Sequence, residues 1–242
     1  MKPMKGKVVC VTGASRGLGR AIAEAFAAEG ASLVLGSRNL GELDAMAHEL
    51  GDALTVQTDV RSVEDVYRLV EVAEAEFGRL DVMVNNAGLA VYGPFEEVTE
   101  DAFDLMMDTN VKGAFFGSQA AYRLMKKQGY GLIINISSIA GKWHLPNESA
   151  YNASKWALNG FTGTLRLEAQ AHNVKVTTVC PGGIDTPFWQ KMDYYPFPTD
   201  QISPSRDFLK PAEIAQTIVH IAKTSDHYVV PEVVILPLIR PR

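Results

Sequence analysis

The sequence is poor in cysteine and has no cluster of histidines, which excludes two kinds of site. Its two cysteines, Cys10 and Cys180, give neither a disulfide framework nor the spacing of metal ligands. Both stand in apolar runs, VVCVTG and VTTVCPG, so we expect them to be buried like small hydrophobic residues. The five histidines form no metal-binding set. We therefore predict a protein without a metal centre.

Long apolar runs and concentrated basic charge are also missing. No run approaches the ~18 apolar residues that a membrane-spanning helix requires. The apolar run in the first residues, MKPMKGKVVCVTG, is too short for a signal peptide. Lysine and arginine are spread along a chain of net charge −5, whereas nucleic-acid-binding proteins concentrate them. We expect a cytoplasmic protein that binds neither a membrane nor a nucleic acid.

What the 242-residue chain does contain is a regular alternation of short apolar runs and longer segments of helical period. The runs are continuously apolar, as burial on both faces of a parallel sheet requires. The alternation predicts one α/β domain over residues 1–242, with a Rossmann-type, doubly wound, seven-stranded parallel sheet and helices on both faces. Strands are expected at 7–12, 31–37, 53–58, 80–88 (with its turn), 131–138, 175–183 and 232–238, and helices at 17–29, 39–50, 63–77, 101–128, 150–171 and 211–224.

Residues 184–210 break this alternation. The segment carries four prolines and many aromatic residues, so it cannot be one continuous helix. Long irregular loops in compact domains are usually functional, and we predict a substrate lid here. The region Phe188–Phe197 and Trp143 are candidate walls of an apolar pocket, although packing or a subunit contact would explain them equally well. His144 either edges that pocket or lies in a surface loop.

The first expected strand ends in TGASRGLG, which places Gly13, Gly17 and Gly19 between a strand and a helix. Glycines in this context let the backbone approach a pyrophosphate, and the helix N-terminus attracts its negative charge. An ordinary tight turn is the alternative. The position after the first strand and before an amphipathic helix favours a dinucleotide-binding loop.

The second expected strand should deliver the residue that distinguishes the two nicotinamide dinucleotides. No acidic residue stands at Ser37 or Arg38, where one would bind a free ribose 2′-hydroxyl group. Arg38, and Arg16 in the glycine loop, could instead bind a 2′-phosphate through their planar guanidinium groups. We therefore predict NADP(H) rather than NAD(H); two surface arginines are the alternative. Asp59 and Val60 should line the adenine pocket.

Several short motifs in order make the chain similar to the short-chain dehydrogenase/reductase family, in its compact branch. The similarity runs from Lys7 to about Pro187 and then weakens. The motifs are TGASRGLG at 12–19, DV at 59–60, NNAG at 85–88, Asn110, Ser138 in NISS, Tyr151 and Lys155 in YNASK, and PGGIDT at 181–186.

The resemblance implies a catalytic set of Asn110, Ser138, Tyr151 and Lys155, with Asn110 helping to hold a proton-relaying water. It implies NADP(H) contacts from Gly13, Ser15, Arg16, Gly17, Leu18, Gly19, Arg38, Asp59, Val60, Asn86, Ala87, Gly88, Tyr151, Lys155, Pro181, Gly182, Ile184 and Thr186, of which Ile184 and Thr186 would meet the nicotinamide carboxamide. It also implies a homodimer or homotetramer. The chain ends in VVPEVVILPLIRPR, without the glycine-rich segment of the related 3-oxoacyl reductases.

The spacing of Tyr151 and Lys155 indicates a chemical role independently of the resemblance. On a helix, residues four apart lie side by side. A cation ~4 Å from a phenolate is worth ~4 kcal/mol at an effective dielectric of ~20. At ~1.4 kcal/mol per pKa unit, this would lower the pKa of the phenol by up to ~3. A phenol adjusted in this way suits proton transfer to or from a carbonyl oxygen.

We therefore predict an NADP(H)-dependent enzyme that interconverts a carbonyl compound, a ketone or an aldehyde, and an alcohol, with a 3-oxoacyl reductase as one form of it. Ser138 would stabilise the charge on the carbonyl oxygen. The alternatives are a non-catalytic NADP(H)-sensing protein of the same fold, and an epimerase or dehydratase. The intact catalytic set speaks against the sensor, and the lack of an added C-terminal domain speaks against the epimerase or dehydratase.

Overall fold

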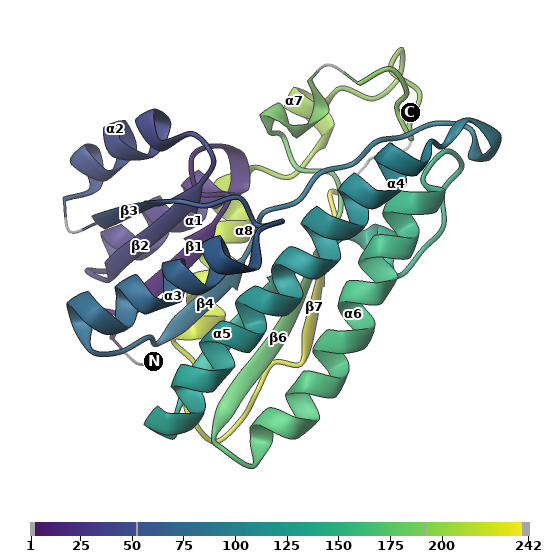
Figure 1. Cartoon of the computed structure of the whole chain (residues 1–242). Coiled ribbons are helices and arrows are strands. Elements are labelled where there is room, and N and C mark those ends of the chain that lie inside the picture. Colours follow the sequence, from purple (N-terminus) through teal and green to yellow (C-terminus); the bar gives the residue numbers. More distant parts are fainter. Residues whose placement is uncertain (1–2, 52, 191, 239–242) are drawn as a thin grey trace.

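Seven parallel strands form one sheet in the order β3–β2–β1–β4–β5–β6–β7 (Figure 1). The structure is a computed structural model and describes residues 3–51, 53–190 and 192–238. The strands are β1 (Val8–Thr12), β2 (Ser32–Ser37), β3 (Ala53–Gln57), β4 (Val82–Asn85), β5 (Gly131–Ile136), β6 (Val174–Pro181) and β7 (Glu232–Ile235). The predicted fold class, a seven-stranded parallel sheet of Rossmann type, is confirmed.

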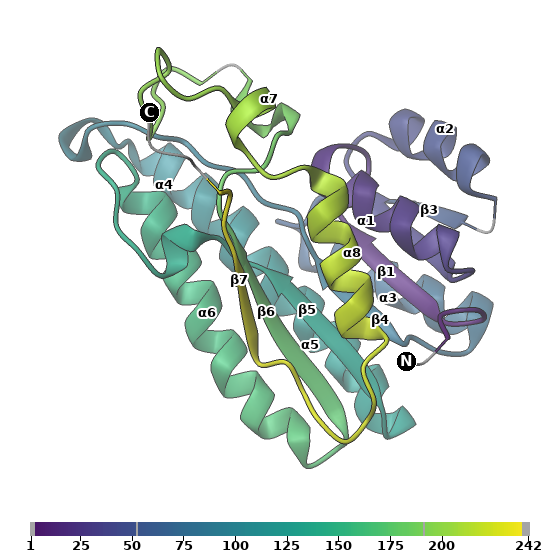
Figure 2. The same cartoon turned by 180° about the vertical axis from the view of Figure 1, so that it is seen from behind.

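Helices cover both faces of this sheet. The α-helices are α1 (Gly17–Ala28), α2 (Leu40–Leu50), α3 (Val63–Phe77), α4 (Glu100–Met106), α5 (Gly113–Gln128), α6 (Ser149–Gln170), α7 (Pro204–Asp207) and α8 (Pro211–Ala222). Figure 1 shows α3, α5 and α6 in front of the sheet, and Figure 2 shows α1 and α8 on the opposite face. Three short segments are 3₁₀-helices: η1 (Phe95–Glu97), η3 (Ile139–Gly141) and η4 (Pro187–Trp189).

Alternating side chains of the strands fill two separate cores. Along β1, Val9 and Val11 face the core under α1, α2 and α8, whereas Val8 and Cys10 face the core under α3, α5 and α6. Successive side chains of a strand point to opposite faces, so a strand buried on both sides is mostly apolar. The exceptions include buried polar residues in β5 (Asn135) and in β6 (Thr177 and Thr178).

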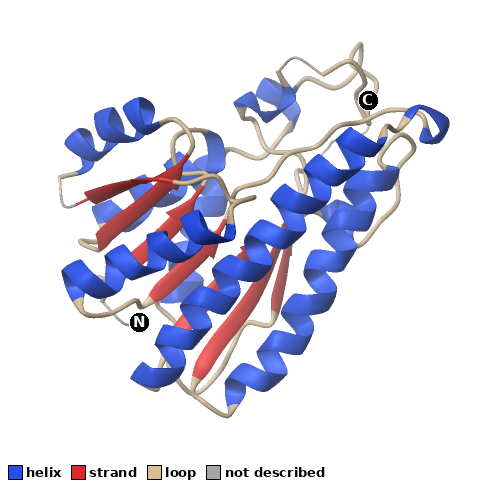
Figure 3. Cartoon of the chain, viewed as in Figure 1, coloured by secondary structure: helices blue, strands red, loops and turns tan. Residues whose placement is uncertain are grey.

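The chain reverses its direction of travel across the sheet between β1 and β4, since β1 is followed outward by β2 and β3, and β4 by β5 to β7. Ligands of open parallel sheets bind at the carboxyl ends of the strands, at such a switch point. Loops from β1, β4, β5 and β6 gather at this edge, as the tan segments of Figure 3 show. The fold therefore brings the sequence motifs that follow these strands to one place.

The helix predicted over 101–128 is wrong as a single α-helix. The structure has α4, then a π-helical segment η2 (Met107–Lys112), then α5. Such π-helical turns insert one residue into an otherwise continuous helix, and they occur often at functional sites. The apolar pattern runs through the insertion, so the sequence reads as one helix. Asn110 lies inside this segment.

The predicted lid also has more order than a loop. Within 184–210 the described residues include η4 and the single turn α7, and position 191 lies outside the described chain. Figure 1 shows this segment at the same end of the sheet as α4. At the C-terminus, β7 ends at Ile235 rather than at the predicted residue 238, and the last four residues of the sequence, 239–242, lie outside the described chain.

Over the described ranges, no helix combines the length and apolarity needed to cross a bilayer. The same ranges hold no group of three or more His, Cys, Asp or Glu side chains that could bind a metal ion.

Two glycines on neighbouring helices give a test of this packing. A Cβ atom on Gly117 of α5 would collide with Asn85 Oδ1. The Asn85 side chain cannot move away easily, because its Nδ2 donates hydrogen bonds to Ser118 Oγ at 3.0 Å and to Asn135 Oδ1 at 2.8 Å. We expect Gly117→Ala to lower the free energy of unfolding by ~1–3 kcal/mol, because overpacking a fixed core is costly. Gly160→Ala on α6, where no atom lies within 4 Å, should raise it by ~0.5–1 kcal/mol. Urea unfolding measures both, and equal effects of the two substitutions would contradict the packing described here.

Candidate active site

A cavity of about 790 Å³ opens at the carboxyl edge of the sheet. This volume is in the range of small-molecule and cofactor sites. Its walls come from the loops after β1, β4, β5 and β6, from the start of α6 and from the 184–210 segment. Every residue predicted to contact NADP(H) borders this cavity: Gly13, Ser15, Arg16, Gly17, Leu18, Gly19, Arg38, Asp59, Val60, Asn86, Ala87, Gly88, Tyr151, Lys155, Pro181, Gly182, Ile184 and Thr186.

Hydrogen bonds fix the glycine loop to the NNAG motif. The Thr12 hydroxyl oxygen accepts hydrogen bonds from the backbone N–H groups of Asn86 and Ala87 at 3.0 and 3.1 Å. In return, Asn86 Nδ2 donates to the carbonyl oxygens of Thr12 and Gly13 at 3.0 and 3.3 Å. Gly13 has a φ of 64°, and a Cβ atom there would lie 2.9 Å from the Ala87 Cα. Two motifs separated by more than 70 residues thus form one rigid wall.

The N-terminus of α1 points its first backbone N–H groups toward the cavity. The N-cap is Arg16, in an extended conformation, and within the described chain no side chain caps the helix. The following Gly17 has a φ of 57°, which glycine adopts without strain. A helix terminus with unbonded N–H groups and a positive macrodipole end attracts anions such as phosphate.

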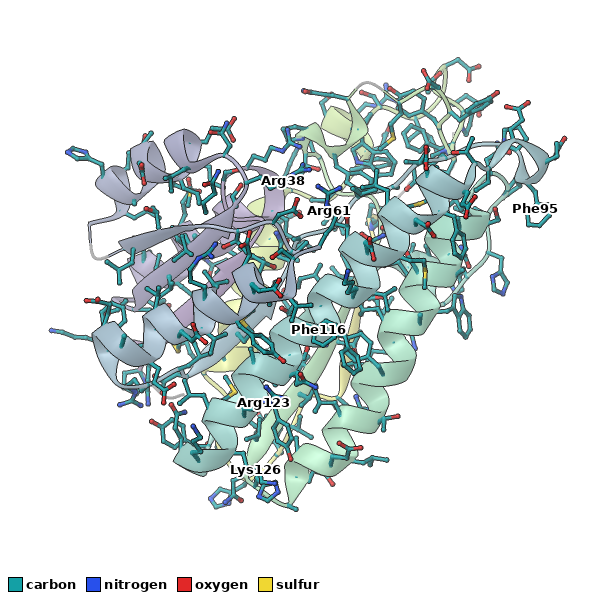
Figure 4. All side chains as sticks on the ribbon, viewed as in Figure 1. Arg38, Arg61, Phe95, Phe116, Arg123 and Lys126 are labelled. Atoms are coloured by element: carbon teal, nitrogen blue, oxygen red, sulfur yellow. The ribbon has the colours of Figure 1, made fainter. Side chains whose placement is uncertain are left out.

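Two arginines border the cavity without a partner. Among the described residues, the guanidinium groups of Arg16 and Arg38 have neither a hydrogen-bond nor an ion-pair partner. Between their loops, Ser37 Oγ donates to Ser15 Oγ at 3.1 Å. Figure 4 shows Arg38 at the same end of the molecule as Arg61. These side chains can bind a phosphate group, whereas nothing acidic stands beside Ser37 to bind a hydroxyl group.

The Asp59 carboxylate is already engaged by the protein. It accepts hydrogen bonds from Arg61 Nε at 3.0 Å and Arg61 Nη2 at 2.6 Å. This pairing with Arg61 lowers the pKa of Asp59, and the Arg38 charge lowers it further. Asp59 therefore contributes to the wall as a paired group.

Tyr151 and Lys155 both lie on the buried face of α6, one turn apart, and both border the cavity. Lys155 Nζ donates to the carbonyl oxygen of Ile136, at the end of β5, at 3.1 Å. The same Nζ lies 5.7 Å from the centroid of the Tyr151 ring. A Cβ atom on Gly88 would lie 3.5 Å from it, at van der Waals contact, so the backbone of the NNAG motif lies beside the ammonium group. The ammonium group is thus held between β5, the NNAG motif and the phenol.

The predicted direction of the Tyr151 pKa is wrong for this structure. Burial raises the pKa of the phenol instead of lowering it, the Ser138 hydroxyl opposes this increase, and the Glu148 carboxylate adds to it. Burial also lowers the pKa of Lys155 to about 8. The helical spacing predicted the neighbours correctly, but it could not show that both groups leave water, and loss of hydration disfavours both charged forms.

Asn110 lies behind the cavity wall rather than in it. The side chain is fully buried and does not border the cavity. Its Nδ2 donates to the Leu89 carbonyl oxygen at 2.8 Å and to Ser154 Oγ at 3.0 Å, and its Oδ1 accepts from the Leu89 N–H at 2.9 Å. Ser154 Oγ donates in turn to the Tyr151 carbonyl oxygen at 2.7 Å. Asn110 therefore ties the loop after β4 to the helix that carries Tyr151.

Ser138 is the second residue after β5 and borders the cavity beside Tyr151. Its Oγ accepts a hydrogen bond from the Ala140 N–H at 3.1 Å, which caps the short segment η3. This bond orients the hydroxyl group and leaves its hydrogen for donation. Ser137 also borders the cavity but is buried.

Aromatic rings from the 184–210 segment and from Tyr92 close one end of the cavity. Tyr92 packs edge-on against Tyr151, with centroids 5.6 Å apart, and stacks on Trp189 at 6.3 Å. Trp189 Nε1 donates to the Ile184 carbonyl oxygen at 2.7 Å. The predicted apolar wall at Phe188–Phe197 borders the cavity at Phe188, Trp189, Pro196 and Phe197, and Trp143 does so as well.

His144 does not belong to this cavity. Its ring stacks on Trp156 with centroids 5.6 Å apart, and Nδ1 lies 3.0 Å from Asn152 Oδ1. Of the two alternatives left open by the sequence, the surface position is the observed one.

Sequence reasoning missed two residues at this end, Tyr92 and Glu148. Both are buried and both border the cavity. Tyr92 follows the NNAG motif in a segment with no periodic pattern, and Glu148 resembles any charged residue before a helix. The position of Glu148, three residues before Tyr151, was the one available signal, because residues three apart on a helix share a face.

Comparisons with known proteins agree with this arrangement. The sequence profile described as short chain dehydrogenase matches residues 7–194. The chain is 35% identical over 243 residues to the sepiapterin reductase of Chlorobaculum tepidum, covering 95% of this chain and 96% of that protein. It is 35% identical over 240 residues to an uncharacterized oxidoreductase of Staphylococcus aureus strain USA300, covering 98% and 100%.

Solved structures match the whole fold. An alcohol dehydrogenase from Thermococcus sibiricus, complexed with 5-hydroxy-NADP, superposes with a TM-score of 0.86 at 31% identity, covering 98% of this chain and 99% of that one. A metagenomic short-chain oxidoreductase in complex with NADP gives 0.83 at 30% identity, covering 99% and 100%. On the family match and these relatives, the chain belongs to the short-chain dehydrogenase family of oxidoreductases.

Proposed function

We propose that this protein is an NADP(H)-dependent oxidoreductase that interconverts a ketone or aldehyde and the corresponding alcohol. One observation carries the proposal: Ser138, Tyr151 and Lys155 border the same cavity as the glycine loop and the open N-terminus of α1. An acid, a hydroxyl donor and a cation thus line one continuous space with an anion-binding loop. A binding protein without catalysis has no need of the first two.

The residues present fit the dinucleotide. The start of α1 and its glycine loop suit a pyrophosphate. Arg16 and Arg38, whose guanidinium groups pair with no other described residue, suit an additional 2′-phosphate. The titles of the Thermococcus sibiricus and metagenomic structures name 5-hydroxy-NADP and NADP. These points support NADP(H) over NAD(H).

A bound nicotinamide would supply the hydride, and the protein would supply the proton and the hydrogen bond to the carbonyl oxygen. In reduction, the carbonyl carbon gains a C–H bond and its oxygen takes the phenolic proton of Tyr151, giving the alcohol. The raised pKa of the phenol keeps that proton in place at neutral pH. Transfer still runs toward the substrate, because an alkoxide is a stronger base than a phenolate. The Ser138 hydroxyl donates to the carbonyl oxygen as negative charge develops there.

Lys155 acts on the charge of the Tyr151 phenol, and Asn110 acts on the position of Tyr151. With a pKa of about 8, the Lys155 ammonium is mostly charged at pH 7 and favours the phenolate formed after proton transfer. Asn110 positions α6 through Ser154, whose hydroxyl binds the Tyr151 carbonyl oxygen. In this proposal the 184–210 segment, with its wall at Phe188 and Trp189, is the lid over the substrate.

A panel of ketones and aldehydes with NADPH, followed by NADPH absorbance, separates the enzyme from a cofactor-sensing protein. Oxidation of NADPH that depends on the added carbonyl compound supports the enzyme. Tight NADPH binding without turnover on any member of the panel would support the sensor.

Tyr151→Phe tests the acid. We expect the variant to bind NADPH as the wild type does and to lose turnover by ~10²-fold or more, because only the phenolic O–H group is removed. Intrinsic fluorescence measures NADPH binding, and initial rates measure turnover. If the variant keeps its turnover, the proton donor is another group.

Ser37→Asp combined with Arg38→Ser tests the cofactor preference. The new carboxylate can accept hydrogen bonds from a free 2′-hydroxyl group, and the lost guanidinium can no longer bind a 2′-phosphate. We expect the ratio of kcat/KM for NADPH to that for NADH to fall by ~10-fold or more, since one charged contact is worth at least that. An unchanged ratio would mean that Arg38 does not contact the phosphate.

We also propose that the protein is a homo-oligomer that associates through the outer faces of α5 and α6. Phe115 and Trp156 are exposed there, and the ring of Phe115 packs on those of Phe116 and Phe161 at centroid distances of 5.3 Å. Exposed aromatic clusters of this kind are typical of interfaces.

We expect Phe115→Glu to shift the molar mass measured by light scattering toward that of the monomer. The control is Phe95→Glu in η1, an exposed residue that Figure 4 shows well away from Phe116, and it should leave the molar mass unchanged. A wild-type monomer would contradict this proposal.

A further inference from the structure

A buried carboxyl group lies at the substrate end of the cavity. The Glu148 side chain is 5% exposed, and it borders the cavity together with Tyr92 and Tyr151. Its charge acts on both phenols and raises the pKa of each. Acidic side chains are almost never fully buried unless they are paired, so a buried and unpaired one calls for a reason.

Among the described residues, no cationic side chain pairs with this carboxylate. Within the residues described, Glu148 has no salt-bridge partner, and its side-chain contact is a long one, 3.5 Å from Asn152 Nδ2 to Oε2. Burial raises its pKa to about 7. The side chain does not cap α6 either, although Glu148 is the N-cap residue. Neither pairing nor capping therefore explains why an acid stands here.

The surrounding walls are aromatic. Tyr92 stacks on Trp189, with ring planes 20° apart, and Phe188 meets Trp189 edge-on at 5.1 Å. Tyr92 and Trp189 cover one face of each other, and an aromatic face that is left open attracts cations such as quaternary ammonium ligands. A carboxylate and aromatic faces favour the same ligand charge.

We propose that the carbonyl substrate carries a positively charged ammonium group, and that Glu148, with the rings of Tyr92 and Trp189, binds this cation. This inference rests on the proposed function and extends it to the class of substrate. It explains the unpaired acid, because the ligand supplies the missing counter-ion.

The position of Glu148 also limits the size of such a substrate. Glu148 is the N-cap residue of α6, and Tyr151 follows three residues later, so both side chains leave the same end of the helix. The phenol would bind the carbonyl oxygen while the carboxylate binds the cation. Because Glu148 and Tyr151 border one cavity, we infer that the carbonyl group and the cation belong to one small molecule, such as a cyclic amino ketone.

Two pairs of ligands with the same shape test the inference. For turnover, N,N-dimethyl-4-oxopiperidinium is compared with 4,4-dimethylcyclohexanone, which has carbon in place of the charged nitrogen. For binding, the corresponding alcohols are compared by calorimetry in the presence of NADPH, where no hydride transfer is possible. The variants are Glu148→Gln, which keeps the shape, and Glu148→Asp, which keeps the charge. Glu168→Gln, on an exposed residue of the same helix, is the control for net charge.

We expect the wild type to bind the cationic alcohol more tightly than the neutral one. Glu148→Gln should lower this ratio of affinities by roughly 10- to 100-fold, the effect of one desolvated charge contact. Glu148→Asp should keep most of the preference, and Glu168→Gln should leave it at the wild-type value. The ratio of kcat/KM for the two ketones should follow the same order.

The possible failures are distinct. A wild type that binds both alcohols equally, or a ratio unaffected by Glu148→Gln, would overturn the inference, and the wild-type result alone suffices if the variant does not fold. If the binding preference depends on Glu148 but no ketone is reduced, the proposed reaction fails while the cation site stands. If the neutral ketone is reduced and the cationic one is excluded, the reaction stands and the cation site fails.

Discussion

The burial of a phenol and an ammonium group side by side is the constraint on which the rest of the site depends. Removing Tyr151 and Lys155 from water disfavours the phenolate and the ammonium alike, and both pKa values change accordingly. The protein offsets part of this cost with the Ile136 carbonyl oxygen, which binds Lys155, and with the Ser138 hydroxyl beside the phenol. Pairs of groups whose pKa values are changed in this way cluster at functional sites.

The fold supplies the rigidity that such an arrangement requires. Thr12 and Asn86 join the glycine loop to the segment after β4, and Asn110 joins that segment to α6. These contacts connect residues that are far apart in sequence, at the edge where the strand order reverses. The same edge receives the start of α1, so a bound anion and the reacting carbonyl group would be held by one connected framework.

Much of this could be predicted from the sequence, because the relevant signals are local. Apolar runs predicted the strands, glycines the loop, and an i, i+4 spacing the Tyr151–Lys155 pair. Three features could not be predicted, because each depends on distant packing. Asn110 lies in a π-helical segment behind the cavity wall, burial reverses the expected change in the pKa of Tyr151, and Glu148 borders the same cavity as Tyr92 and the 184–210 segment.

The most direct test of the central claim follows the hydride itself. NADPH deuterated at C4 of the nicotinamide is incubated with the protein and a small ketone, and the alcohol is analysed by NMR. Each face of C4 is labelled in turn, and the account predicts deuterium on the carbinol carbon from one of the two labelled forms and none from the other. A protein that binds NADPH and leaves every ketone unlabelled and unreduced would contradict it.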